Sequence, residues 1–182
     1  MKRLAVLACA VSLSVAGCNG SISPVTPSGL VSFVSQLTGS QNVPPAGSLE
    51  AGATGTVQIT MTPASDGSGN YTASVTLSLA NLLKAGVLPP AYAPMDTMGS
   101  VIVAGYIHQG AAGALGAVVV NTGISQAAPI ASPTGTAVIT ISGITITSTV
   151  AQGMIANAPG FYFNLYSAMN QNGVMRGQLA KQ

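Results

Sequence analysis

The sequence predicts an all-β protein, an antiparallel β-sandwich of about eight strands with little helix. Segments rich in Val, Ile and Thr alternate apolar and polar side chains, and this period of two is typical of half-buried strands. Clusters of Gly, Pro, Asn and Asp separate the segments at short intervals, as turns do between the strands of sandwiches and barrels.

The first three strands have the clearest alternation. In the second of them Val57, Ile59 and Met61 alternate with polar residues, and a loop of Asp, Gly, Ser and Asn at 66–70 leads into the third as a hairpin. These strands are predicted at 31–38, 54–62 and 70–80.

The later elements follow the same pattern more weakly. A helix of one or two turns is expected near 148–156, and a long Pro-rich connection runs over 84–98. Loops of that length are often functional, so it is either a lid or partner-binding flap or a segment that caps an open end of the sandwich. The remaining strands are predicted at 100–108, 116–121, 135–143, 160–167 and 174–180.

Charge is scarce in this chain. Of its 182 residues 48% are hydrophobic and only 4% are charged. An apolar chain with so little charge lacks the composition of a disordered protein, and it lacks the clustered Lys and Arg of a nucleic-acid-binding protein. No nucleic-acid partner is therefore expected.

The N-terminus has the pattern of a secretory signal peptide. Lys2 and Arg3 precede an apolar stretch of about a dozen residues, too short to span a bilayer. The stretch ends in Val-Ala-Gly-Cys, which resembles the lipobox of bacterial lipoproteins, so residues 1–17 are predicted to be a lipoprotein signal peptide. The resemblance implies that Cys18 carries the lipid anchor and that Asn19 directs the protein to the outer membrane.

The mature chain then divides into a tether and a domain. Residues 18–29 are the lipidated cysteine and a flexible Gly/Ser/Pro linker, and residues 30–182 form the sandwich. The expected location is extracytoplasmic, at the cell envelope, with the membrane as a partner through the lipid. Cys9 would leave with the signal, so the domain has no thiol for a disulfide or a metal.

Few residues of the domain are suited to catalysis. Its carboxylates, Glu50, Asp66 and Asp96, are scattered, and no nucleophile elbow or phosphate-binding loop accompanies the single histidine, His108. We therefore expect no enzyme activity and no cofactor.

One group of polar and aromatic residues is a candidate functional site. Residues two apart in a strand share a face, so two predicted strands can bring polar and aromatic side chains together around the histidine, joined by a strand-borne arginine. Such a cluster either binds a ligand or buries polar groups that satisfy one another under a loop. Its members are Tyr106, His108, Tyr162, Asn164, Tyr166 and Arg176.

Four motifs, in order along the chain, resemble the CHRD (chordin) domain family. They are Leu-Thr-Gly-Ser-Gln-Asn-Val-Pro-Pro at 37–45, Tyr-Ile-His-Gln-Gly at 106–110, Tyr-Phe-Asn-Leu-Tyr at 162–166 and Gly-Val-Met-Arg-Gly-Gln-Leu at 173–179. The resemblance implies an extracytoplasmic β-sandwich with an immunoglobulin-like or superoxide-dismutase-like appearance. It implies no enzyme activity.

The chain departs from the family pattern at three positions. Tyr106 and Tyr166 stand where the family has histidines, and Val174 stands where it has glutamate. Members with three histidines have ligands suited to Zn or Cu, whereas this chain keeps one, and a metal site usually needs three or four ligands. We predict no metal site.

Three functions remain open. The first is a non-enzymatic, lipid-anchored envelope module for protein interaction or scaffolding. The second is a small-ligand binder in which tyrosines stack on a carbohydrate. The third is a metal-binding, superoxide-dismutase-like protein that uses His108.

Overall fold

The computed structural model describes residues 29–47, 49–87, 91 and 97–182. The predicted signal peptide, Cys18 and most of the 84–98 connection lie outside these residues. Within them the chain forms ten strands, one α-helix and two short 3-10 segments at Gly39–Gln41 and Ala158–Gly160. The all-β, antiparallel prediction is confirmed.

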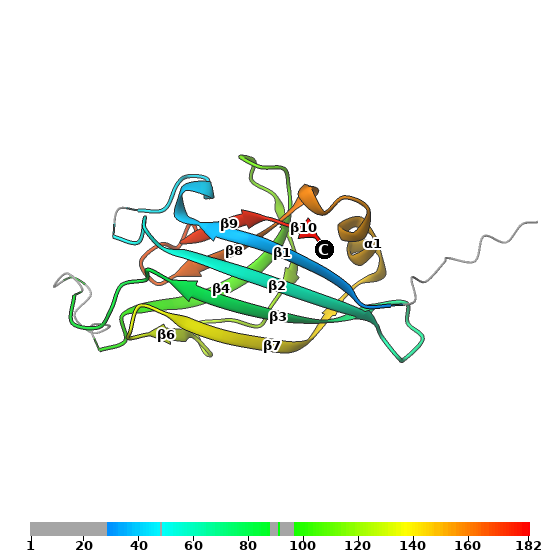
Figure 1. Cartoon of the computed structure of the whole chain (residues 1–182), viewed down its shortest axis with the longest axis horizontal. Coiled ribbons are helices and arrows are strands. Elements are labelled where there is room, and N and C mark those ends of the chain that lie inside the picture. Colours follow the sequence, from blue (N-terminus) through cyan, green and yellow to red (C-terminus); the bar gives the residue numbers. More distant parts are fainter. Residues whose placement is uncertain (1–28, 48, 88–90, 92–96) are drawn as a thin grey trace, which may run out of the picture.

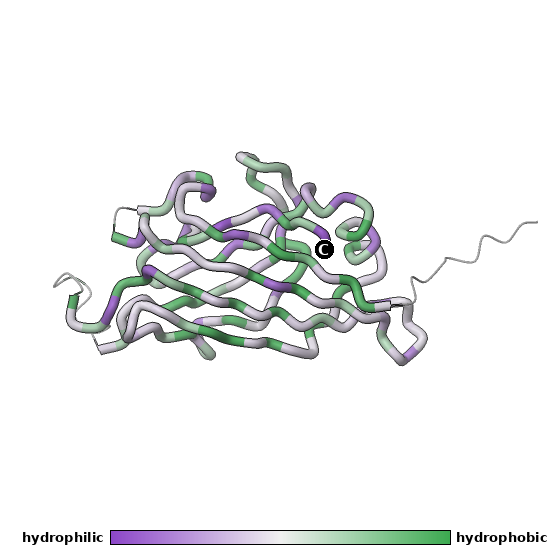
Figure 2. The backbone as a smooth tube through the Cα atoms, in the orientation of Figure 1, coloured by the Kyte–Doolittle hydropathy of each residue, from purple (hydrophilic) through white to green (hydrophobic). Residues whose placement is uncertain are grey.

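The strands lie close to their predicted positions. β1 to β5 span Val31–Thr38, Thr54–Pro63, Tyr71–Ala80, Ser100–Gln109 and Ala117–Asn121; β6 to β10 span Ile130–Ser132, Ala137–Ile146, Phe161–Ser167, Met175–Gln178 and Ala180–Lys181. Apolar and polar residues interleave along most of them (Figure 2).

All ten strands belong to one sheet, not to two separate ones. Eight of them follow the order β5-β4-β8-β9-β1-β2-β3-β7, while β10 also pairs with β1 and β6 with β4. The sheet curls until β7, at one end of this order, packs near β5 and β6 at the other, which gives a nearly closed, barrel-like wall (Figure 1). Adjacent strands of a sheet are twisted relative to one another, and over many strands this twist accumulates. A long antiparallel sheet therefore tends to curl.

Two predicted strands differ in detail. The last one, 174–180, is interrupted at Leu179 and forms β9 and β10: β9 lies between β8 and β1 and pairs with both, whereas β10 pairs with β1. The strand predicted at 135–143 extends to Ile146. Ile130–Ser132 was not predicted as a strand, since three residues are too few to show alternation.

The core fills the inside of the curled sheet. Phe33, Ile59, Leu77, Ile107 and Phe163 are among its fully buried side chains. The α-helix, α1 (Ser148–Ala156), lies near one end of the strands (Figure 1) and buries Ala151 and Met154 in the same core.

Candidate functional site

The six residues of the predicted cluster lie on three neighbouring strands. On β4, β8 and β9, Tyr106 is opposite Asn164 and Asn164 is opposite Arg176, while His108 is opposite Tyr162. Residues of the other parity, such as Ile107 and Phe163, point into the core. The cluster therefore lies on the outer face of the sheet, where His108, Tyr162, Asn164 and Arg176 are buried while Tyr106 and Tyr166 are half-buried.

His108 is buried at 6% exposure, and both of its ring nitrogens have hydrogen-bond partners. Nδ1 lies 2.9 Å from the carbonyl oxygen of Gly116, which can only accept, so Nδ1 carries the proton. Nε2 is then the acceptor, and the hydroxyl of Tyr166 donates to it at 3.1 Å. The pKa of His108 lies below its ordinary value, mainly because burial disfavours the charged ring and also because Arg176 repels it, against the opposing effect of the Gly116 carbonyl.

The depressed pKa of His108 predicts a pH-dependent stability. The unfolded chain takes up a proton at His108 as the pH falls through about 6.5, before the folded protein does, so the free energy of unfolding should decrease from pH 7 towards pH 5. His108 is the only histidine, so His108→Gln should flatten this part of the profile. Urea unfolding of both proteins at several pH values measures the effect, and parallel profiles would contradict it.

Tyr162 lies at the centre of a stack of three side chains. Its ring is parallel to the His108 imidazole, with centroids 4.7 Å apart and planes 6° apart, and the Arg176 guanidinium carbon lies 3.5 Å from its centroid. Because β4 and β9 flank β8 on opposite sides, Tyr162 separates the imidazole from the guanidinium. Its hydroxyl accepts a hydrogen bond from the N–H of Gly116 (3.0 Å).

Two side chains of β9 hold the β4–β5 loop over this face. Nη2 of Arg176 donates to the carbonyl of Ala111 at 2.9 Å, and Nε2 of Gln178 donates to the carbonyls of Gly110 (2.9 Å) and Pro159 (2.7 Å). Gln178 is absent from the predicted cluster. Its place two residues after Arg176, on the same strand face, is the signal that would have included it.

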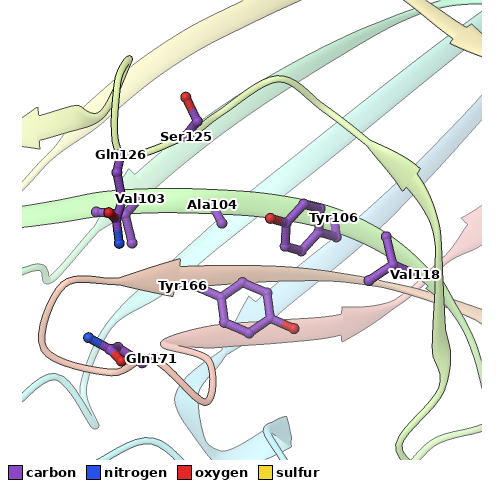
Figure 3. A pocket seen from close by; sticks show the side chains of 8 residues that line it. All are labelled: Val103, Ala104, Tyr106, Val118, Ser125, Gln126, Tyr166 and Gln171. Carbon is purple, nitrogen blue, oxygen red and sulfur yellow. The ribbon is translucent and has the colours of Figure 1, made fainter.

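A pocket of about 480 Å³ opens beside the stack (Figure 3). The rings of Tyr106 and Tyr166, from β4 and β8, form its floor with centroids 5.6 Å apart, and burial raises the pKa of Tyr166. No charged side chain is among the described residues that line it. The other lining residues are Val103, Ala104, Val118, Ser125, Gln126 and Gln171.

The carboxylates of the described chain are engaged elsewhere. Glu50, which the sequence placed in a loop, is only 1% exposed and accepts short hydrogen bonds from Ser100, Ser167 and Asn170 (2.5, 2.5 and 2.6 Å). Asp66 lies in the β2–β3 hairpin, where hydrogen bonds from Ser68 lower its pKa. Neither is a hydrogen-bond partner of His108.

Two further findings concern only the described residues. No three of their His, Cys, Asp and Glu side chains gather where they could hold a metal ion. None of their helices is both long and apolar enough to cross a membrane.

The comparisons with known proteins give a family. Neither a curated protein nor a solved structure matches the chain. The CHRD domain matches residues 33–179, which run from β1 to the residue just before β10 and include every member of the cluster. The chain therefore belongs to the CHRD domain family.

Proposed function

We propose that this protein is a non-enzymatic binding module, tethered to the cell envelope by lipid on Cys18, that engages a protein partner through the face bearing the Tyr106–Tyr166 pocket. The observation that carries the proposal is an open, uncharged, aromatic pocket beside a histidine whose two nitrogens are already hydrogen-bonded. Aromatic rings supply large contact areas at low entropic cost, and they are enriched in protein interfaces.

The surroundings of the pocket favour a protein partner. Val118, which lines the pocket, is 51% exposed on β5, and Leu115 is 75% exposed in the loop before it. β5 ends the strand order, and an edge strand offers backbone groups for pairing. Exposed apolar side chains, an aromatic pocket and a sheet edge thus occur together.

A photo-crosslinking residue at position 118 tests this proposal in the producing cell. Val138 supplies the matched control, because it is also an exposed valine on a terminal strand, β7, at 76% exposure. The proposal expects one discrete adduct from position 118 that Tyr106→Ala removes, and none from position 138. Equal labelling from both positions would contradict it.

The tether gives a separate expected outcome. Several acyl chains anchor a protein stably, whereas one chain does so only marginally. Cys18→Ser should therefore move the protein from the membrane fraction to the soluble fraction, with the fold unchanged because the domain begins after the linker. Fractionation with immunoblotting measures this, and a variant that stays in the membrane fraction would refute the lipid anchor.

Carbohydrate binding is the second candidate, and the pocket lining favours it. Tyrosine rings can stack on a sugar face, and the amides of Gln126 and Gln171 can hydrogen-bond to hydroxyls. The chain has no Trp, so neutral oligosaccharides should change its tyrosine fluorescence if they occupy the pocket. The response should disappear in Tyr106→Ala and persist in Val138→Ser.

A metal-binding role for His108 would require rearrangement of the site. Nδ1 is the protonated nitrogen, and Nε2 accepts the hydrogen bond of Tyr166, which a metal would have to displace. Elemental mass spectrometry of the wild-type protein and of the His108→Ala variant tests whether His108 binds a metal. Stoichiometric Cu or Zn that is lost in the variant would favour the superoxide-dismutase-like alternative over our proposal.

A further inference from the structure

Tyr106 and Tyr166 form a close pair of aromatic rings on two neighbouring strands. Tyr106 is opposite Asn164 and Tyr166 is opposite Ala104, so the two tyrosines are diagonal neighbours on one face of the sheet, within reach of each other. Their ring centroids lie 5.6 Å apart, with the planes tilted by 58°. Figure 3 shows the rings offset along the strands, so that the hydroxyl-bearing half of each ring lies nearest to the other ring.

Of the described tyrosines, these are the two that an oxidant in solution can reach. Both are half-buried and line the open pocket, whereas Tyr71 and Tyr162 are each 1% exposed. The chain has no Trp, and residues 30–182 contain no Cys, so no indole or thiol of the domain competes for a one-electron oxidant. One-electron oxidation of the described domain is therefore directed to the Tyr106–Tyr166 pair.

The Tyr166 phenol already has a proton acceptor. A phenol gives up its proton when it loses an electron, and the Tyr166 hydroxyl donates to Nε2 of His108 at 3.1 Å. Nδ1 of His108 keeps its own proton on the Gly116 carbonyl, so Nε2 is the nitrogen that can receive another. Burial lowers the pKa of His108, so the imidazole passes the proton on to water rather than retaining it.

We propose that Tyr106 and Tyr166 are a modification site, at which one-electron oxidation joins the two rings as an intramolecular dityrosine. Two equivalents of a one-electron oxidant, such as a metal complex in its higher oxidation state, each take up one electron, and each phenol releases its proton. The two phenoxyl radicals then form a carbon–carbon bond between their ortho (Cε) carbons. The hydrogen on each joined carbon moves to the phenol oxygen, so the protein loses two hydrogen atoms in all.

The fold favours coupling within one molecule over coupling between two. Reacting groups that are held close together behave as if they were at a very high concentration. Partly exposed side chains still change rotamer rapidly, which allows the rings the remaining approach. The new bond would fix the rings that form the floor of the pocket. Reduced partner binding after oxidation is a consequence that rests on the proposed function, whereas the coupling itself does not.

Photo-oxidation of the full-length protein, purified as its cell processes it, tests the inference. The oxidant is ruthenium tris-bipyridyl, with persulfate as the terminal electron acceptor. We expect dityrosine fluorescence in the monomer band, a mass lower by two hydrogen atoms, and a peptide map that links positions 106 and 166. The yield per molecule should not depend on protein concentration, and it should fall at least tenfold in urea, where unfolding separates residues that are 60 positions apart. Equal yield in urea, or dityrosine only in covalent dimers, would overturn the proposal.

Single tyrosine variants assign the two partners of the bond. Tyr106→Phe and Tyr166→Phe each remove one reacting phenol and should each lower the yield at least tenfold. Tyr71→Phe is the matched control, because this buried hydroxyl has no hydrogen-bond partner among the described residues, and it should leave the fold and the yield unchanged. Unchanged yield in Tyr166→Phe would overturn the assignment. The coupling needs no partner, so its failure would leave the adduct from position 118 unaffected, and absence of that adduct would leave the coupling unaffected.

Discussion

Glu50→Ala is expected to destabilise the domain by about 3 kcal/mol, since it removes three hydrogen bonds to a buried charged group. The carboxylate connects three segments: its own loop, the start of β4 through Ser100, and the end of β8 through Ser167 and Asn170. The variant also leaves the hydroxyls of Ser100 and Ser167 buried without this acceptor. The expected fall in melting temperature is roughly 6–12 °C for a domain of this size.

Two variants sharpen this test of Glu50. Glu50→Gln keeps the shape and one acceptor oxygen, and the serine hydroxyls can rotate to accept from the new amide, so its loss of stability should be clearly smaller. Asp66→Ala removes a fully exposed carboxylate from the β2–β3 hairpin and should change the melting temperature little. Thermal unfolding by circular dichroism compares the three, and a Glu50→Ala melting temperature equal to that of wild type would show that the network adds no stability.

The network around Glu50 also holds a neighbouring loop in place. Oδ1 of Asn170 accepts a hydrogen bond from the N–H of Gly47 at 2.8 Å, so the network holds the loop that begins with Ser40 and Asn42. Glu50→Ala should leave Tyr106 and Tyr166 in place, because their strands pair independently of this loop.

Gly177→Ala is expected to destabilise the protein by about 3 kcal/mol, at the upper end of the range for overpacking. A β-carbon at this position of β9 would collide with the backbone carbonyl of Gln36 and with the Ser35 hydroxyl, both on β1. Backbone cannot rotate away as a side chain can, so β9 must shift relative to β1. Arg176 and Gln178, the neighbours of this glycine, would move with it and release the β4–β5 loop.

Gly52→Ala is the matched control for this glycine. It adds the same methyl group where no atom lies within 4 Å, so its stability should stay within about 0.5 kcal/mol of wild type. Urea denaturation of both variants, with tyrosine fluorescence as the probe, measures the difference. Equal stabilities would mean that β1 and β9 have room to separate at no cost.

The cluster shows what the local sequence pattern predicts and what it does not. It predicts which side chains share a strand face, but not which strands are neighbours. Period-two alternation puts Tyr106 with His108, and Tyr162 with Asn164 and Tyr166, because successive strand residues point to opposite faces. Which strands are neighbours depends on long-range pairing. β8 and β9 are consecutive strands, but β4 and β8 pair residues more than 50 positions apart. The sequence therefore could not by itself predict that His108 stacks on Tyr162 beside Arg176.

Glu50 and Asn42 illustrate what local pattern cannot show. Both lie outside the strands, in segments whose composition is that of exposed loops, yet they are 1% and 2% exposed. Their burial results from packing against residues far along the chain, as with Asn170, which follows Glu50 by 120 residues. A periodic signal exists only where one face of a regular element is buried, and a loop has no such period.

By itself, the sequence determined the fold class, seven of the strands to within a few residues, the helix at 148–156 and the CHRD motifs, because alternation, turn residues and short motifs are local. Tertiary structure decided that the strands form one curled sheet, that the final strand is interrupted at Leu179, and that Glu50 becomes a buried link. These features depend on which distant segments meet, and the free energy that selects them comes from pairing and burial across the whole chain.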